Sequence, residues 1–246
     1  WFLLNETERR LLQHLSVFRG RFQQAAARLI AQASALTLLT LCDKSLLSID
    51  DGHYKVHELI RQFAAEKLSA NPQEEAQIRA AHSVYYADFL IACENHLNSD
   101  SLVHAIQDIT EEIDNVHAAW EYALAHRDLP LLGKFLKPFY YYYDVHCHYN
   151  EGAEMFRQLA AVLADAAEAS NATPSQARMV QARGCILQAS MFVCMSRYKE
   201  AQPLINQNLS VVQVQNLPWE TRIGLASLGT IHYAQGQYAD SWSFYE

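Results

Sequence analysis

The sequence has few residues that break regular structure. It contains 8 glycines and 6 prolines in 246 residues, with no run of like charges and no low-complexity tract. Half of its residues are hydrophobic, which is enough to bury a substantial core. Long disordered segments are therefore excluded, and we expect two compact units or a small domain followed by an extended array.

Long apolar stretches and clustered cysteines are also lacking. No apolar run approaches membrane-spanning length, and the chain starts at Trp1 without the charged, apolar and small-residue segments of a secretory leader. The cysteines are widely scattered and form no CxxC pair, which suits reduced thiols better than a disulfide framework. They are Cys42, Cys93, Cys147, Cys185 and Cys194. These absences predict a soluble, cytoplasmic protein.

Motifs for catalysis and for metal or nucleotide binding are absent too. The only Gly-Lys pair, at 133–134, precedes Phe135 and lacks the earlier glycine of a P-loop, and no nucleophile elbow or paired-carboxylate signature occurs. His146, Cys147 and His148 are neighbours, but adjacent helical residues point about 100° apart and no second ligand cluster follows. The sequence therefore predicts a non-enzymatic chain without a metal or a cofactor of its own.

Charge is unevenly distributed along the chain. The net charge is -8, with 9 Lys/Arg against 7 Asp/Glu in residues 1–70 and 10 against 20 in the remainder. An acidic C-terminal part disfavours non-specific binding to nucleic acid or to anionic membranes. The change near residue 70 indicates a domain boundary.

The first 70 residues begin with the pattern of three helices. Asn5 and Glu8 can form a capping box for a helix that Gly20 ends, and a second helix is expected at 23–32. Ser34 can cap a third helix, which is apolar on nearly all sides and is therefore expected to be buried.

A hairpin and a closing helix follow. Asp51-Gly52 favours a tight turn between "SLLSI" and "YKV". Apolar residues then recur at helical spacing from Val56 to Leu68, and Asn71-Pro72 stops the pattern. Three helices, a hairpin and a closing helix predict a winged-helix domain.

The remainder is expected to be α-helical, with Thr110 capping one of its helices. Near the C-terminus the chain repeats itself, since "SRYKEAQPLI" (196–205) aligns with "GQYADSWSFY" (236–245), and "CHYNEGAEMF" (147–156) fits the same template. Three places after each tyrosine stands a small residue, Gly152, Ala201 or Ser241, which lets two helices approach closely. The pattern predicts a superhelical array that resembles tetratricopeptide repeats. Because the chain stops inside the last such unit, we expect it to be a fragment of a longer protein.

A DNA-binding interpretation of residues 1–70 places the third helix in the major groove. That helix, "SALTLLTLCDKS", offers one lysine at its end, whereas a recognition helix needs Lys, Arg, Asn or Gln directed at phosphates and bases. Protein packing is the favoured use of this helix.

Several segments together resemble a family. "LSVFRGRFQQAAARLI", "LTLCDKSLLSIDDGHYKVHELIRQFAAEKL", "AHSVYYADFL", "EEIDNVHAAWEYALAHRDL" and "HYNEGAEMFRQLAAVL" resemble, in that order, bacterial signal-transduction ATPases of the STAND (NB-ARC-like) class, many of which are LuxR-type transcriptional regulators. The resemblance implies a P-loop ATPase core upstream of the winged helix and a repeat array that acts as a sensor. It also implies ATP or ADP as the nucleotide of the longer protein.

The resemblance assigns a role to His57. Val56-His57-Glu58 is similar to the Met-His-Asp motif of related switch proteins, in which the histidine contacts the β-phosphate of ADP and latches the closed state. An imidazole at a helix N-terminus can join an anion site. The alternative is that His57 only caps the helix and packs against the wing.

Four consecutive tyrosines, at 140–143, sweep nearly a full helical turn, so at least one or two rings are expected at the surface. We expect Tyr141, Tyr142 and His146 to form a ligand or partner surface. Tyr140 and Tyr143 are expected to wedge between helices.

These inferences predict a winged-helix domain at 1–70, a helical connector at 71–135 and tetratricopeptide-like repeats at 136–246. The expected function is regulatory and non-catalytic. Its expected partners are the protein's own upstream ATPase domain and a protein or small-molecule inducer at the repeats, without nucleic acid or membrane. A stand-alone interaction scaffold and a DNA-binding regulator are the alternatives.

Overall fold

A computed structural model describes residues 1, 3–97, 101–169 and 174–244, without the side chains of residues 165–169 and 174–175. Across these residues the chain is mainly α-helical, with thirteen helices and one three-stranded sheet. The predicted dominance of helix after residue 73 is confirmed for the described part of the chain, because all three strands precede that residue.

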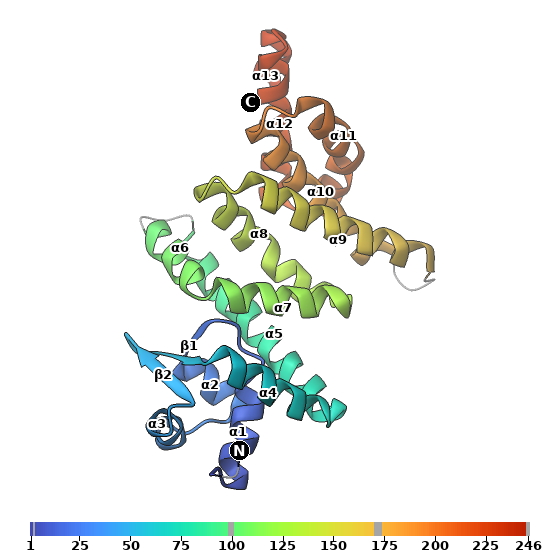
Figure 1. Ribbon diagram of the computed structural model, residues 1–246. Coiled ribbons are helices and arrows are strands. Elements are labelled where there is room, and N and C mark those ends of the chain that lie inside the picture. Colours follow the sequence, from blue (N-terminus) through green and yellow to red (C-terminus); the bar gives the residue numbers. More distant parts are fainter. Residues whose placement is uncertain (2, 98–100, 170–173, 245–246) are drawn as a thin grey trace. The chain divides into compact units, whose positions relative to one another are not determined.

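The chain divides into two compact units, Trp1–His126 and Arg127–Glu246 (Figure 1). The first unit contains α1 (Glu6–Leu15), β1 (Arg21–Gln23), α2 (Gln24–Ala31), α3 (Ala35–Asp43), β2 (Leu47–Asp50), β3 (His53–Val56), α4 (Glu58–Ser69), α5 (Pro72–Glu94), α6 (Leu102–Glu111) and α7 (Ile113–Ala125). The second contains α8 (Leu129–Val145), α9 (Tyr149–Ala169), α10 (Pro174–Cys194), α11 (Tyr198–Val214), α12 (Pro218–Ala234) and α13 (Tyr238–Ser243). The functional limits expected at residues 70 and 135 stay a prediction.

Local capping fixes several helix starts as the sequence predicts. The Asn5 side chain accepts the Glu8 N–H at 2.9 Å, and the Glu8 carboxylate accepts the Asn5 N–H at 2.9 Å, which completes the capping box. Ser34 accepts the N–H of Thr37 at 3.0 Å at the start of α3. These short-range bonds need only a few neighbouring residues, so sequence patterns predict them well.

Two predicted helix limits are wrong. The first helix ends at Leu15, before Gly20, because Ser16 already closes its last turn with bonds to Gln13. Thr110 does not cap a helix. It lies within α6 and donates its hydroxyl to the Ile106 carbonyl at 2.7 Å, and α7 begins only after Glu112.

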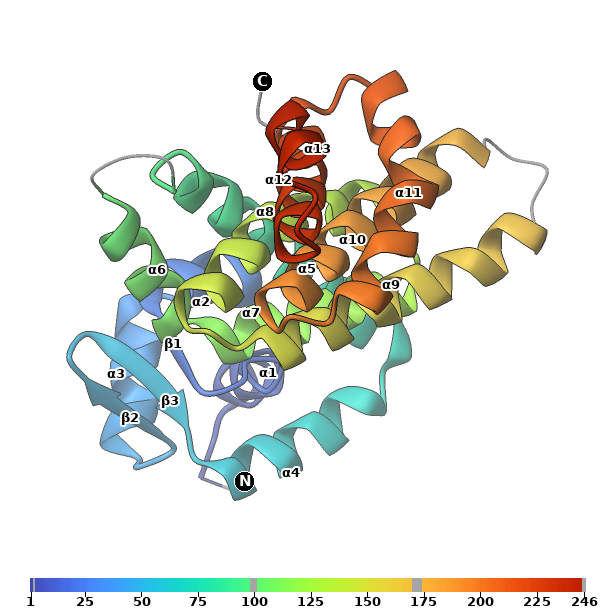
Figure 2. The same ribbon diagram turned by 90° about the horizontal axis from the view of Figure 1, so that it is seen from above.

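The sheet is antiparallel, with strand order β1-β3-β2. The predicted hairpin joins β2 to β3, and its turn residues Asp51 and Gly52 have φ values of 48° and 75°. The hairpin projects beside α3 in the same unit (Figures 1 and 2). The sequence did not predict β1, because three residues are too few to show a period, although Phe22 of this strand is fully buried opposite Tyr54.

Helix α3 is not buried on all sides, so that prediction is wrong. Leu38 and Leu41 are buried, but Leu36 and Leu39 are 74% and 50% exposed. One face of α3 packs toward the core and β2, and no described element of the unit covers the other face.

A buried amide links the segment between α1 and β1 to α7. Asn115 of α7 is fully buried, and its side chain oxygen accepts the Arg19 N–H at 2.7 Å. Its amide group donates to the Arg21 carbonyl at 2.6 Å and to the Glu112 carboxylate at 3.0 Å, and Tyr86 of α5 donates to the same carboxylate at 2.8 Å. The segment between α1 and β1 is therefore held against α7 by two part-buried hydrogen bonds, and the bonds to Glu112 behind them are buried.

The second unit is built from helices that pack against their neighbours in sequence, with α10 contacting α8, α9, α11 and α12. Figure 2 shows α9 beside α10 in this unit. Five of its turns share one conformation, in which the residue two places before the next helix has a φ between 51° and 79°. These residues are Arg127, Cys147, Ser196, Asn216 and Gly236.

The small residues that the repeat pattern predicts at close contacts are buried. A side chain on Gly152 would place its Cβ 3.0 Å from Tyr143. Ala201 is fully buried, and Ser241 is buried with its hydroxyl donating to the Gly229 carbonyl at 2.8 Å. The close helix approach expected at these three positions is confirmed. Tyr245, the last residue of the aligned repeat, lies outside the described residues.

Alanine is expected to affect stability differently at two equivalent turns, those of Gly236 and Ser196. Gly236→Ala is expected to lower the free energy of unfolding by about 1 kcal/mol, because a side chain at a φ of 79° meets the strain of the left-handed region. At the equivalent turn, the natural Ser196 already places a side chain in the left-handed region, at a φ of 58°. Ser196→Ala therefore adds no new strain and is expected to change stability by less than about 0.5 kcal/mol. Urea denaturation of both variants measures the difference, and equal losses would contradict the shared turn geometry.

No single helix among the described residues is long and apolar enough to cross a membrane. Taken together, α2 and α3 are long and apolar enough to cross one by length and composition alone, but the two helices are bent by 108° relative to each other.

Candidate functional site

His57 lies at the junction between the sheet and α4. It follows β3 directly and is the N-cap residue of α4, with an extended backbone (φ -60°, ψ 134°). Its side chain is exposed and makes no capping hydrogen bond with the helix. His57 therefore occupies the N-cap position through its backbone, while its imidazole is bonded to no backbone N–H of the first turn. The alternative that His57 only caps the helix and packs against the wing stays open.

The imidazole instead lines a hollow of about 590 Å³ between the end of α3, β2, β3 and the start of α4. The same hollow is lined by the ammonium-bearing Lys55 and by the hydroxyl-bearing Ser45 and Ser48. Antiparallel pairing sets Lys55 of β3 opposite Ser48 of β2, so the strand register brings these groups together.

The one carboxylate at the hollow is already bonded. Glu58 accepts two hydrogen bonds of 2.8 Å from the Arg61 guanidinium and one of 2.8 Å from Gln62. These bonds, led by the one from Arg61, lower the pKa of Glu58 to about 2. Arg61 also donates to the Ser16 carbonyl at 3.2 Å, which fixes the pair against the end of α1.

The chemistry of this hollow suits an anion. It combines an imidazole, an ammonium group and two hydroxyls with the first turn of a twelve-residue helix whose N–H groups have no side-chain cap. Helix N-termini carry partial positive charge and bind phosphate and carboxylate groups.

Buried titratable groups lie around Asn115 in the same unit. His82 of α5 is 3% exposed, its ring packs edge-on to Phe18, and burial lowers its pKa to about 4. Glu112 is 4% exposed, and burial raises its pKa against the opposing hydrogen bonds from Tyr86 and Asn115. Neither group is an unpaired buried charge. Burial favours the neutral ring of His82, and the Glu112 carboxylate accepts hydrogen bonds from Tyr86 and Asn115.

The buried histidine predicts an acid-sensitive first unit. In the unfolded chain His82 binds a proton near its ordinary pKa of 6.5, but in the folded chain only near 4, so stability present above pH 6.5 is lost as the pH falls from 6.5 to 4. The loss is expected to reach about 3 kcal/mol at pH 4. His82→Gln should flatten this part of the curve of unfolding free energy against pH. A slope unchanged by the substitution would contradict the assignment.

The four tyrosines of α8 divide between packing and partial exposure. Tyr140 and Tyr143 are buried, as predicted, with the Tyr140 hydroxyl 3.1 Å from Ser190 and Tyr143 against Gly152. Tyr142 is also buried, at 8% exposed, and offers little surface to a partner because its ring packs on Tyr143 and His146. Tyr141 is the tyrosine of this set whose ring stays partly open.

Tyr141 belongs to an aromatic cluster that joins α8 to α12. The Trp219 indole N–H donates to its hydroxyl at 3.4 Å, and the Trp219 ring lies edge-on to Tyr140 with centroids 5.4 Å apart. The Lys137 ammonium lies 5.7 Å from the centre of the Trp219 ring. Trp219 is half-buried, so the cluster presents aromatic surface beside a cation.

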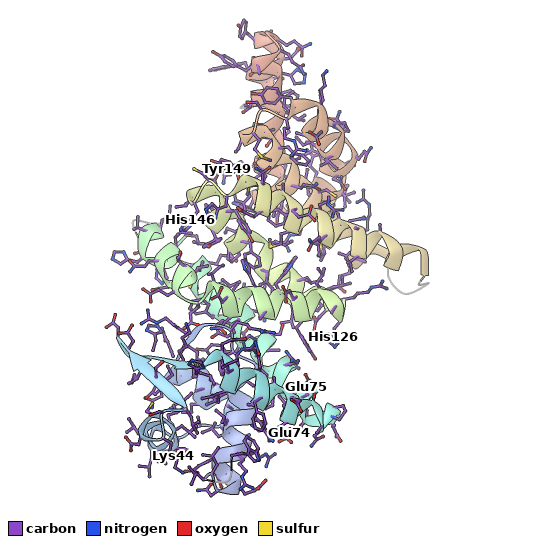
Figure 3. All side chains as sticks on the ribbon, in the orientation of Figure 1. Lys44, Glu74, Glu75, His126, His146 and Tyr149 are labelled. Atoms are coloured by element: carbon purple, nitrogen blue, oxygen red, sulfur yellow. The ribbon has the colours of Figure 1, made fainter. Side chains whose placement is uncertain are left out.

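His146 lies away from this cluster, at the C-terminal end of α8. Figure 3 shows it near Tyr149, where α9 begins. Its Nδ1 lies 2.9 Å from the Tyr142 carbonyl, and its ring faces that of Tyr142 at 4.6 Å. His146 thus contacts Tyr142 and His148, whereas Tyr141 contacts Tyr140 and Trp219.

A buried ion pair joins helices of the same unit. Arg183 of α10 pairs with Glu220 of α12, whose side chain is 5% exposed, and also donates to the Gly133 carbonyl of α8 at 3.3 Å. These bonds connect α8, α10 and α12 at one point. Sequence reasoning missed both Arg183 and Trp219, because their partners lie 37 to 78 residues away and no local pattern joins them.

Among the described residues, no group of three or more His, Cys, Asp or Glu side chains could hold a metal ion. The five cysteines are free thiols, of which Cys93 and Cys185 are buried.

Comparison with known proteins gives limited matches. No protein-family model matches the chain. Proteins named as candidate HTH-type transcriptional regulators, from Mycobacterium bovis and from two strains of Mycobacterium tuberculosis, are 32% identical over 171 residues. The match covers 64% of this chain and 19% of each relative, so the chain spans about a fifth of the length of these relatives.

One solved structure is similar over most of the chain. It is the crystal structure of a Signal Transduction ATPase with Numerous Domains (STAND) protein with a tetratricopeptide repeat sensor, from Pyrococcus horikoshii. The alignment covers 99% of this chain and 50% of that one, at 15% identity and a TM-score of 0.32. A score of this size does not establish a shared fold.

Proposed function

We propose that this chain is a regulatory, non-catalytic part of a STAND-type signalling or transcriptional regulator. In this proposal residues 1–70 form a winged helix that couples to a nucleotide-binding domain, and the helices after residue 135 form a sensor array. The observation that carries the proposal is the order of elements, in which a small helix-and-sheet module leads directly into stacked helix pairs. The regulator names of the 32% identical relatives support the same class.

The first module supports the winged-helix interpretation. Its order is α1, β1, α2, α3, β2, β3 and α4, and the β2–β3 hairpin forms the wing of a sheet whose central strand is β3. The exposed apolar residues Leu36 and Leu39 on α3 suit packing against protein better than reading of DNA bases.

His57 is the proposed nucleotide contact of this module. Its hollow offers the imidazole, Lys55 and an uncapped helix start to a phosphate group supplied by the nucleotide of the upstream domain. A contact of this kind favours the conformation in which the winged helix and the nucleotide domain are closed on each other.

The second unit is the proposed sensor. The shared turns and the buried small residues support tetratricopeptide-like stacking. The cluster of Tyr141, Trp219 and Lys137 is the proposed contact surface for an inducer, because aromatic rings with polar tips are frequent in binding sites. Inducer binding would change the equilibrium of the winged helix, release ADP and permit oligomerisation.

The nucleotide sequence upstream of this segment provides the first test. A GxxxxGK[ST] motif within the preceding few hundred codons is the expected result, since the proposed switch needs a P-loop. Its absence would contradict the switch and favour a stand-alone scaffold that binds a protein partner.

DNA binding by the winged helix is the second candidate, favoured by the module's element order and by the HTH names of the relatives. A gel-shift experiment on the 246-residue chain at moderate salt separates the two. We expect no shift, because α3 directs leucines outward. Tight, salt-sensitive binding would support the DNA candidate instead.

A further inference from the structure

The C-terminal half of α5 and the helix α6 face each other with matched stripes of residues. Phe89, Ala92 and Cys93 lie on one side, and His104, Ala105 and Asp108 lie on the other. Both sets have helical spacing, so each stripe is a single face of its helix. Between them lies a groove of about 420 Å³, within the range of small-molecule sites in proteins, which is roughly 300–1,000 Å³.

The floor of this groove is apolar. Phe89 is half-buried, and Ala105 and Cys93 are buried at 3% and 7% exposed. Burial, and then the charge of Asp108, raise the pKa of the Cys93 thiol to about 11, so the thiol is neutral at pH 7 and adds apolar surface. An occupant therefore needs an apolar body.

Among the described residues, the rim carries one carboxylate and neither a lysine nor an arginine. Asp108 is exposed and forms no ion pair or hydrogen bond with any residue in the described part of the chain. The residues that line the groove include two imidazoles, of His96 and His104, but no lysine or arginine. Residues 71–246 also hold ten more acidic than basic side chains, which attracts cations to this part of the chain.

Other occupants fit these groups less well. A divalent metal needs several oxygen or nitrogen ligands, and no suitable group of three occurs among the described residues. An anion would meet the Asp108 carboxylate with no lysine or arginine among the described lining residues to offset it, and a neutral apolar molecule would cover that carboxylate without satisfying it.

We propose that the groove between α5 and α6 binds a small organic cation, a protonated amine carried on an apolar or aromatic group. The ammonium group pairs with Asp108, and the apolar body rests on Phe89, Ala92 and Cys93, with the Phe89 ring available for a cation–π contact. This site is separate from the hollow at His57 and from the aromatic cluster of the second unit, and it does not depend on the proposed function.

Three probes of nearly equal size test the proposal on the 246-residue chain: 2-phenylethylammonium, 2-phenylethanol and phenylacetate. Calorimetry and chemical-shift mapping should give the cation a Kd of about 1 mM or lower, as expected for nine non-hydrogen atoms. The alcohol and the anion should bind at least about tenfold more weakly, because only the cation forms a charge-assisted bond with Asp108.

Two substitutions assign the binding to the groove. Asp108→Asn should weaken the cation about tenfold and remove its advantage over the alcohol, while Asp43→Asn, at an exposed carboxylate on α3, should have no effect. Ala92→Phe fills the groove from an exposed position that tolerates a larger side chain, and it should abolish binding of all three probes. Circular dichroism verifies that each variant is folded.

Three results would overturn the proposal. One is the absence of saturable binding by any probe. Another is equal affinity for cation and anion, and the third is a cation affinity that Asp108→Asn or Ala92→Phe leaves unchanged.

Discussion

Replacement of Asn115 by alanine is expected to lower the free energy of unfolding of the first unit by about 3 kcal/mol. The amide is fully buried and satisfies the Arg19 N–H, the Arg21 carbonyl and the Glu112 carboxylate at 2.6 to 3.0 Å. Its removal takes one hydrogen-bond partner from each of these groups, of which Glu112 keeps the bond from Tyr86, and each buried group left unsatisfied costs about 1–3 kcal/mol. Part of this cost is recovered where the segment between α1 and β1 relaxes.

Urea denaturation and amide hydrogen exchange measure this effect together. Exchange at the Arg19 amide should accelerate first, because that N–H loses its acceptor directly. Asn95→Ala, at an exposed asparagine after α5, is the matched control and should change stability by less than about 0.5 kcal/mol. If Asn115→Ala matched the control, the buried amide would not hold the two parts of the unit together.

Glu220→Ala is expected to destabilise the second unit by about 3–5 kcal/mol. Glu220 is buried, and its loss would leave the Arg183 guanidinium as an uncompensated charge between α8, α10 and α12. Replacing both partners, Arg183→Met with Glu220→Leu, should restore most of the stability, since a well-packed apolar pair is often as stable as a buried ion pair.

A surface ion pair provides the comparison for this experiment. Arg197 and Glu200 are 41% and 52% exposed, so Glu200→Ala should cost less than about 1 kcal/mol. Chemical denaturation of the four proteins gives the ranking. Equal losses for Glu220→Ala and Glu200→Ala would show that burial adds nothing to the Arg183–Glu220 pair.

Features that depend on nearby residues could be predicted from the sequence. The capping box of α1, the Asp51-Gly52 hairpin and the close contacts at Gly152, Ala201 and Ser241 each follow from a short pattern, and the structure has all of them. The exposure of α3 could not be predicted, because an apolar helix looks the same in sequence whether one of its faces or all of them are covered.

The candidate sites also combine features set by nearby residues with features set by distant ones. The switch from strand to helix places His57 at a helix start, but the approach of Ser45, Ser48 and Lys55 depends on the sheet register. Asn115 bonds to the backbone 96 residues earlier, and Trp219 bonds to a hydroxyl 78 residues earlier. A single sequence does not show which distant residues pack together, so these contacts required the structure.

The role of His57 is the central claim, and ADP retention in the longer protein that includes the upstream segment tests it most directly. His57→Ala is expected to release bound ADP about tenfold faster, the effect of losing one charge-assisted hydrogen bond to a phosphate. His126→Ala, at an exposed histidine after α7 (Figure 3), is the control and should retain ADP as the natural protein does. Equal ADP release from both variants and the natural protein would contradict the claim.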